Sequence, residues 1–168
     1  PSSRSTLPCT VSCAHGEAEF RHVPGATANR IGTRAGDLVA ALGDARAEAI
    51  RRSASVALRA RDGADYAGGW LIRLEGDDSP APLRDTAAFR GKSAIVRVVR
   101  SATAPFTYTA SAAADRGLVR FGPRGALDAN TPAWFRICDT AHPTVPGRIV
   151  QVNVVGKISL DSTTERCA

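Results

Sequence analysis

The segment TANRIGTRAGDLVAALGDARAEAIRRSAS, residues 27–55, constrains the fold most, because it carries the one strong helical pattern in the sequence. Its apolar residues recur at offsets of three and four, so they form one face of a helix. This predicted apolar face consists of Ile31, Ala35, Leu38, Leu42, Ala45 and Ala49. The opposite face is charged, and its acidic residues precede Arg51 and Arg52, an order that suits the helix dipole. The pattern predicts an amphipathic helix over about 31–52, which must bury its apolar face against another element.

After residue 53 the pattern changes to short segments rich in β-branched and aromatic residues, separated by turn residues. The pair Gly68–Gly69 is predicted to make a turn before one of these segments. The predicted strands lie within 55–62, 68–76, 92–101, 106–111, 117–123, 133–139 and 147–155. One helix that leads a set of short antiparallel strands predicts an α+β fold, with the N-terminal helix packed on antiparallel sheets.

The first 25 residues show no clear period and are rich in serine, proline and small residues. We interpret them as a flexible or vector-derived segment, which leaves one globular domain over 26–168. Cys9, Cys13, His15 and His22 lie in this segment. A metal site there is one interpretation, but the segment lacks the paired C-x-x-C spacing of zinc sites, so an adventitious cysteine pair is favoured. We therefore expect no bound metal.

The other two cysteines are Cys138 and Cys167. A disulfide between them would close a loop of 29 positions, and on the chain-entropy estimate it would stabilise the fold by about 3–4 kcal/mol. Two unrelated buried thiols are the alternative. The disulfide is favoured because a cysteine in a polar C-terminal tail has little core in which to be buried. A disulfide also implies an oxidising compartment.

The net charge of +6 comes from the second half of the chain. Residues 1–83 carry ten basic and ten acidic side chains, whereas residues 84–168 carry twelve basic and six acidic ones. A basic half favours an anionic partner such as nucleic acid. The alternative is a solvated basic face that reflects GC-rich codon usage. The candidates for phosphate contacts are Arg120, Arg124, Arg136, Arg148, Lys157 and Arg166. Aromatic residues make up only 5%, which disfavours a platform for stacked bases.

Motifs typical of enzymes are missing from the sequence. It contains neither G-x-S-x-G nor H-E-x-x-H, and its three histidines have no spacing typical of a catalytic triad. TAAFRGKS, residues 86–93, ends like a phosphate-binding loop, but Thr86 replaces the first glycine and a strand-like segment follows where a helix is needed. Gly156-Lys157 fails for the same reasons and is predicted to be a turn between two strands. We expect no catalytic residues and no cofactor, and therefore not an enzyme.

Four segments between residues 28 and 167 resemble, in order, segments of FimT/GspH-type pilins. The end of the predicted helix and the strand after it resemble the family's "aRseAikr" stretch and first strand. GGWLIRLEG resembles its GW strand, and RFGPRGAL resembles its "i-F-p-x-G" segment. FRICDTA and GRIVQVNVVGKISLDSTTERC are similar to its C-terminal strands, including the final cysteine. The resemblance implies the pilin/GspH-like version of the α+β fold.

The resemblance implies a minor pilin of a type IV pilus, which helps to prime assembly with its β-domain exposed and has other pilins as partners. One alternative is a FimT-like subunit that captures DNA for natural transformation, and another is a GspH-like pseudopilin of type II secretion. Pilin-like proteins begin with a basic leader and a long hydrophobic helix, which are not found in this sequence. We expect that a missing apolar half of the helix would hold the subunit in the inner membrane, facing the periplasm, before it enters the extracellular filament of a Gram-negative bacterium.

DNA-binding FimT proteins resemble one another in a G-R-x-R motif near the C-terminus. The matching positions here are Gly156, Lys157, Ile158 and Ser159, so the second arginine is replaced by serine. The replacement removes one bidentate phosphate contact and about one unit of the salt slope. With this motif incomplete, DNA binding ranks second to filament assembly. The candidate DNA contacts are Arg124, Arg136, Arg148, Gly156, Lys157 and Arg166.

Overall fold

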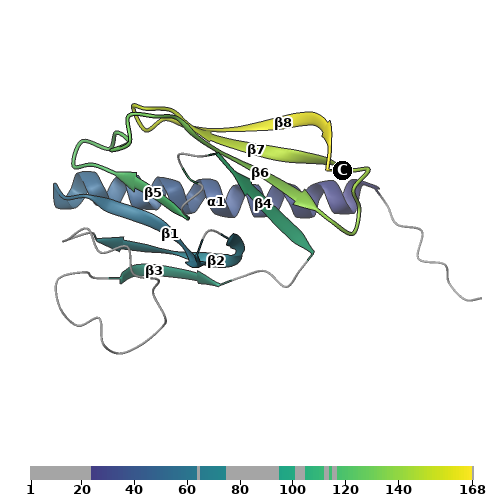
Figure 1. Ribbon diagram of the computed structural model, residues 1–168, viewed down its shortest axis with the longest axis horizontal. Coiled ribbons are helices and arrows are strands. Elements are labelled where there is room, and N and C mark those ends of the chain that lie inside the picture. Colours follow the sequence, from purple (N-terminus) through teal and green to yellow (C-terminus); the bar gives the residue numbers. More distant parts are fainter. Residues whose placement is uncertain are drawn as a thin grey trace, which may run out of the picture.

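The computed structural model describes residues 24–63, 65–74, 95–100, 105–111, 114 and 117–167, and Figure 1 shows how they are arranged. The described residues form one helix followed by eight strands, which pair into two four-stranded antiparallel sheets. Both sheets lie along the same long helix (Figure 1). The predicted α+β fold, with a helix packed on antiparallel sheets, is therefore confirmed. Residues 1–23, with Cys9 and Cys13, and the segment 86–93 lie outside the described residues.

The helix α1 (Pro24–Arg52) ends where the sequence predicts but begins well before residue 31. Proline suits the first turn of a helix, because its missing N–H would have had no partner there. All six residues of the predicted apolar face are fully buried, and Thr27, also fully buried, is part of the additional first turns. The helix stops at Ser53, which adopts the left-handed conformation of a C-terminal cap with a φ of 48°. Within the described ranges, no helix is long and apolar enough to cross a membrane.

The first sheet has the strand order β3-β2-β1-β5. Its strands are β1 (Val56–Asp62), β2 (Asp65–Leu74), β3 (Ile95–Arg100) and β5 (Leu118–Phe121). The turn between β1 and β2 falls at Gly63, with a φ of 79°, so the prediction of a turn at Gly68–Gly69 is wrong. Both glycines lie inside β2, because that strand begins early enough to place Tyr66, which is fully buried, in the core.

The second sheet has the strand order β4-β6-β7-β8. Its strands are β4 (Phe106–Ala110), β6 (Ala133–Asp139), β7 (Pro146–Val152) and β8 (Ile158–Arg166). β6 covers the predicted range 133–139, whereas β7 stops short of residue 155. The chain leaves the strand at Asn153, where the turn into β8 begins.

The core lies between α1 and the inner sides of both sheets, and two aromatic pairs join the sheets to each other. The ring centroids of Trp70 on β2 and Tyr108 on β4 are 5.8 Å apart, and those of Tyr66 on β2 and Phe135 on β6 are 4.9 Å apart. Both pairs have the edge-to-face geometry that aromatic quadrupoles favour. The outer sides of the two sheets are thereby left to form the surface.

Candidate functional site

A disulfide between Cys138 of β6 and Cys167 holds the end of β8. Their Cα atoms are 5.5 Å apart, which is within the usual range for a disulfide. The bond passes over Gly147 of β7, where an added Cβ would lie 3.1 Å from both sulfur atoms and 2.7 Å from the Ile137 carbonyl oxygen. Glycine is therefore required beneath the disulfide.

The pair Gly156-Lys157 lies in the turn between β7 and β8, where the sequence predicts a turn. The Gly156 N–H donates to the Asn153 carbonyl at 2.8 Å, and the Asn153 N–H donates to the Lys157 carbonyl at 3.0 Å. The Asn153 side chain also accepts the Lys157 N–H at 2.8 Å. Gly156 has a φ of 80°, a conformation that glycine adopts at little cost. These bonds make a closed, well-defined turn rather than an open phosphate-binding loop.

This turn meets the loop after β5 and the helix α1 at a single point, which we call the three-way junction and which consists of Arg46, Gly125 and Gly156. The Arg46 Nε donates to the Gly125 carbonyl at 2.9 Å. A Cβ added at Gly156 would lie only 1.8 Å from the same carbonyl oxygen, and a Cβ at Gly125 would lie 2.7 Å from the Ile50 side chain. The loop and the turn are also bonded directly, since the Leu127 N–H donates to the Val154 carbonyl at 3.0 Å. The junction thus depends on two glycines and one arginine.

The three-way junction brings two of the predicted DNA-binding residues to one corner of the molecule. Lys157 follows Gly156 in the sequence and Arg124 precedes Gly125, and both cationic residues are exposed. The sequence pattern suggested no role for Arg46, because an isolated arginine on the polar side of a helix gives no signal of a distant partner. The candidate site at this corner is therefore a small basic surface built on a rigid backbone contact.

The helix α1 ends beside this corner, and the positive charge of its last turn is partly neutralised. Glu48 forms ion pairs with Arg51 and Arg52, with nitrogen–oxygen distances of 2.5 and 2.6 Å. Hydrogen bonds from Arg51, and then from Arg52, hold the pKa of Glu48 below its ordinary value. Glu48 therefore stays ionised at neutral pH and reduces the positive potential at the end of α1.

Arg136 and Arg148 lie on neighbouring strands but on opposite sides of the second sheet. Arg148 pairs with Ile137, which is fully buried, so this pair shares the side that faces α1. Arg136 pairs with Ile149 and alternates with buried neighbours, which places it on the outer side. The two arginines therefore do not form one surface with each other.

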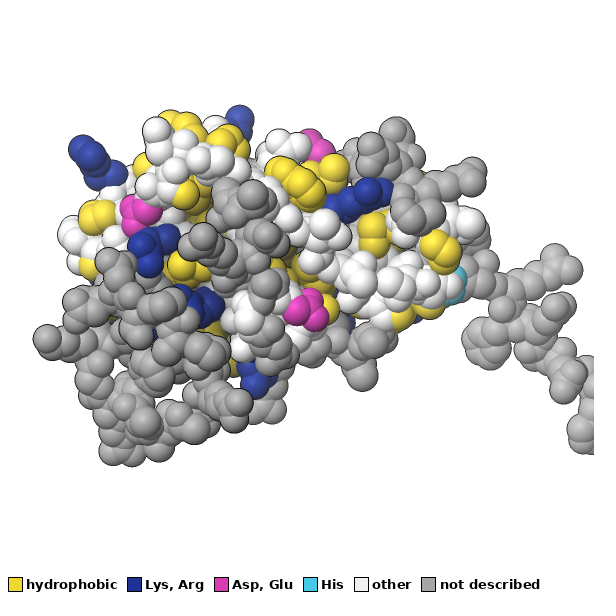
Figure 2. All heavy atoms as spheres, viewed as in Figure 1, with side chains coloured by type: hydrophobic (Ala, Val, Ile, Leu, Met, Phe, Trp, Pro, Cys, Tyr) yellow, Lys and Arg dark blue, Asp and Glu magenta, His cyan; other side chains and the backbone are white. Residues whose placement is uncertain are grey.

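Arg166 is at the far end of β8 from Lys157, since it pairs with Pro146 near the disulfide. β8 has nine residues, and at the usual rise per residue this separates the two ends by about 30 Å. Figure 2 shows Lys and Arg side chains spread among hydrophobic and uncharged surface rather than gathered in one patch on the face in view. Of the six candidate DNA contacts, the structure brings together Arg124, Gly156 and Lys157 only.

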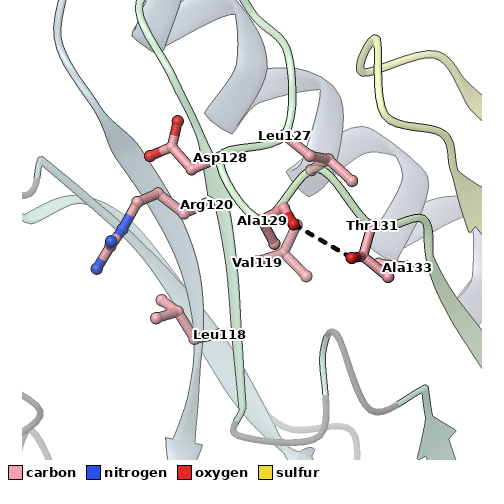
Figure 3. Close-up of a pocket in the computed structure, with 8 residues that line it drawn as sticks. All are labelled: Leu118, Val119, Arg120, Leu127, Asp128, Ala129, Thr131 and Ala133. Atoms are coloured by element: carbon pink, nitrogen blue, oxygen red, sulfur yellow. Dashed lines mark hydrogen bonds between the residues drawn. The ribbon is translucent and has the colours of Figure 1, made fainter.

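A pocket of about 230 Å³ lies between β5 and the loop that leads to β6 (Figure 3). Its lining residues are Leu118, Val119, Arg120, Leu127, Asp128, Ala129, Thr131 and Ala133. In Figure 3, Leu118 and Arg120 extend from the opposite side of β5 to Val119, and the Thr131 hydroxyl donates to the Ala129 carbonyl at 3.2 Å. Five of the eight lining residues are apolar, and Arg120 and Asp128 are the charged ones.

The described ranges contain no group of three His, Cys, Asp or Glu side chains that could hold a metal ion. His142 lies next to Asp139, with 3.2 Å between Nδ1 and Oδ2, and the same fully buried carboxylate accepts the Ala141 N–H at 2.9 Å. These contacts shape the turn between β6 and β7. The closeness of His142 and Asp139 is therefore explained by the structure of this turn.

One long helix whose apolar face is covered by two antiparallel sheets, with a disulfide at the C-terminal hairpin, defines the chain as a pilin-like protein. More specifically, the chain belongs to the GspH family, because the family model described as type II transport protein GspH matches residues 34–156. A search among curated proteins finds no match.

Two solved structures share this fold over most of their length, and both are crystal structures of the type IV minor pilin FimU from Pseudomonas aeruginosa. The form in space group P21 gives a TM-score of 0.62 at 22% identity and covers 83% of this chain and 96% of that one. The form in space group P65 gives a TM-score of 0.60 at 23% identity and covers 82% and 99%. At this identity the likeness shows a common fold.

Proposed function

We propose that this chain is a minor pilin subunit of a type IV pilus, which contributes to assembly and priming and exposes its β-domain on the filament. The observation that supports the proposal is the fold itself, since the helix and both sheets match the minor pilin FimU over nearly the whole length of that chain. Membership of the GspH family implies a place in the cell envelope or its filaments. Its partners in this proposal are other pilins, and an N-terminal apolar helix would anchor it in the inner membrane before assembly.

Deletion of the gene in its own bacterium tests the proposal. We expect surface pili, counted by electron microscopy after negative staining, to fall strongly, and the wild-type gene in trans to restore them. Secretion of folded exoproteins into the medium should not change. Normal pili together with lost secretion would contradict the proposal and favour the alternative of a GspH-like pseudopilin of type II secretion.

A second candidate function, DNA capture by a FimT-like minor pilin, is favoured by one specific observation. Lys157, at the position of the first arginine in the incomplete G-R-x-R motif, lies at the same corner as Arg124, because Gly156 and Gly125 are in close contact at the three-way junction. Two phosphate contacts give a salt slope of about −1.8 on duplex DNA, so affinity should fall about tenfold between ~50 and ~200 mM salt.

A gel-shift titration of duplex DNA at ~50 mM salt tests this second function, because non-specific binding is strongest at low salt. The double variant Arg124→Gln/Lys157→Gln should lose the shift. Arg148→Gln is the matched control, since Arg148 lies on the side of the sheet that faces α1. No shift for the wild-type protein, or an equal loss in the control, would rule out DNA binding at this corner.

A further inference from the structure

The outer side of the second sheet carries an exposed tryptophan. Trp134 on β6 is 41% exposed, while its neighbours Ala133 and Phe135 are buried and point toward α1. Strand alternation therefore directs the indole to the outer side of the sheet. A large exposed aromatic side chain is informative, because burial of a tryptophan is strongly favourable.

Trp134 is one member of a row of side chains that crosses three strands. It pairs with Gln151 of β7, and Gln151 pairs with Ser159 of β8. Residues that pair directly across strands share one side of the sheet. The row borders a groove of about 350 Å³. The side chains and backbone that line it belong to Pro132, Ala133, Trp134, Gln151, Val152, Asn153, Lys157 and Ser159.

The groove is held in shape by hydrogen bonds at both ends. The Ser111 hydroxyl accepts a hydrogen bond from the backbone N–H of Trp134 at 3.1 Å, and the backbone N–H of Ser111 donates to the Trp134 carbonyl at 2.9 Å. At the other end, Asn153 binds the backbone of Lys157 through both its N–H and its side-chain oxygen. A site that is fixed before a ligand arrives loses less entropy on binding.

We propose that this groove binds an acidic sugar, specifically a uronic acid residue of a polysaccharide. One side of a pyranose ring is a flat apolar surface of C–H groups, which packs on an indole such as that of Trp134. The sugar hydroxyls exchange hydrogen bonds with the Gln151 amide and the Ser159 hydroxyl. Lys157 is the one charged residue among those that line the groove, and its ammonium group can pair with the single carboxylate of a uronic acid.

The charges around the groove favour a sugar over a nucleic-acid strand. A nucleic acid bound along the groove itself would need further cations for its phosphates, whereas Lys157 is the one charged residue among those that line the groove. The neighbouring outer row pairs Arg136 with Ile149 and Ile149 with Asp161, so it contains a carboxylate as well as a cation. Sugar binding in this groove can be measured on the isolated protein, so its test does not depend on whether the chain assembles into a filament.

The test is a titration of the protein with trigalacturonate, followed by isothermal calorimetry and by tryptophan fluorescence. The chain has two tryptophans, and Trp70 is buried at 4% exposure, so protection of the emission from iodide reports on Trp134. We expect Trp134→Ala to weaken binding about tenfold or more, in keeping with the loss of an aromatic contact. Lys157→Gln should weaken trigalacturonate about fivefold and leave neutral galactotriose unchanged.

The matched control is Arg124→Gln, which removes an exposed cation that does not line the groove and should leave trigalacturonate binding unchanged. An oligothymidylate of similar length serves as the competing ligand. Tighter binding of the oligothymidylate through Trp134, unchanged trigalacturonate binding in Trp134→Ala, or no binding at millimolar concentration would each overturn the proposal. Unfolding curves of every variant show whether an observed loss comes from the site or from instability.

Discussion

Replacement of Gly156 by alanine should destabilise the fold far more than an ordinary surface substitution in a turn. The new Cβ would lie 1.8 Å from the Gly125 carbonyl oxygen and 2.9 Å from the Arg46 Nε. The carbonyl would have to move, and this movement breaks the hydrogen bond that Arg46 donates to it. The substitution therefore acts on the whole three-way junction.

Two contributions set the expected magnitude. Gly156 has a φ of 80°, and an alanine in the left-handed region costs about 1–2 kcal/mol. Loss of a hydrogen bond from a charged donor costs about 1.5–3 kcal/mol. Together they give a decrease in the free energy of unfolding of roughly 2.5–5 kcal/mol.

Gly63→Ala provides a matched control. Gly63 also lies in a turn between strands, with a φ of 79°, but a Cβ there would have nothing within 4 Å. It should show the backbone cost alone, about 1–2 kcal/mol. Urea unfolding followed by circular dichroism compares the two variants, and Arg46→Ala should cost less in the Gly156→Ala background than in the wild type. Equal stabilities of the Gly63 and Gly156 variants would refute the reasoning.

Three further predictions concern the disulfide, the core and the response to alkali. Replacement of both Cys138 and Cys167 by serine should lower the free energy of unfolding by about 3–4 kcal/mol, with no further effect of a reductant on the variant. Leu38→Ala, at a fully buried position of α1, should cost about 2–5 kcal/mol by calorimetry, whereas Ala40→Ser on the exposed side should cost under about 0.5 kcal/mol. Burial raises the pKa of Tyr108 to about 12. Because the folded phenol holds its proton to higher pH than the unfolded one, with its pKa of about 10, stability should fall between about pH 10 and 12, and Tyr108→Phe should reduce that fall.

The helix and most strands could be predicted from the sequence, because the spacing of their apolar residues indicates which side chains are buried. The apolar face of α1 follows from spacing alone, and β6 matches its predicted range, with burial that alternates from Ala133 to Ile137. The prediction of a turn at Gly68–Gly69 is wrong, because a pair of glycines allows the backbone to turn but does not require it to do so. The early start of the helix at Pro24 could not be predicted, because residues 24–30 contain no large apolar side chain and give a weak pattern.

The candidate site was only partly predictable, because it depends on contacts between distant segments. The turn at Gly156 follows from the strands on each side, but the sequence gives no sign that Gly156 touches Gly125 or that Arg46 bonds there. The separation of Arg136 from Arg148 depends on strand register, which single-sequence patterns do not define. The groove beside Trp134 could not be predicted for the same reason, since its residues come from three strands and the segments next to them.

The disulfide at Cys167 changes how the fold responds to a pulling force applied at its C-terminal end. β8 is the outermost strand of its sheet, and an edge strand pulled from its free end would normally peel away one hydrogen bond at a time. Here the bond carries the force past β8 and β7 to Cys138 on β6, so the pull acts on an interior strand. We expect single-molecule extension from the C-terminus to need a markedly lower force after reduction of the disulfide. Equal unfolding forces in the oxidised and reduced proteins would show that the disulfide does not transmit the pulling force to β6.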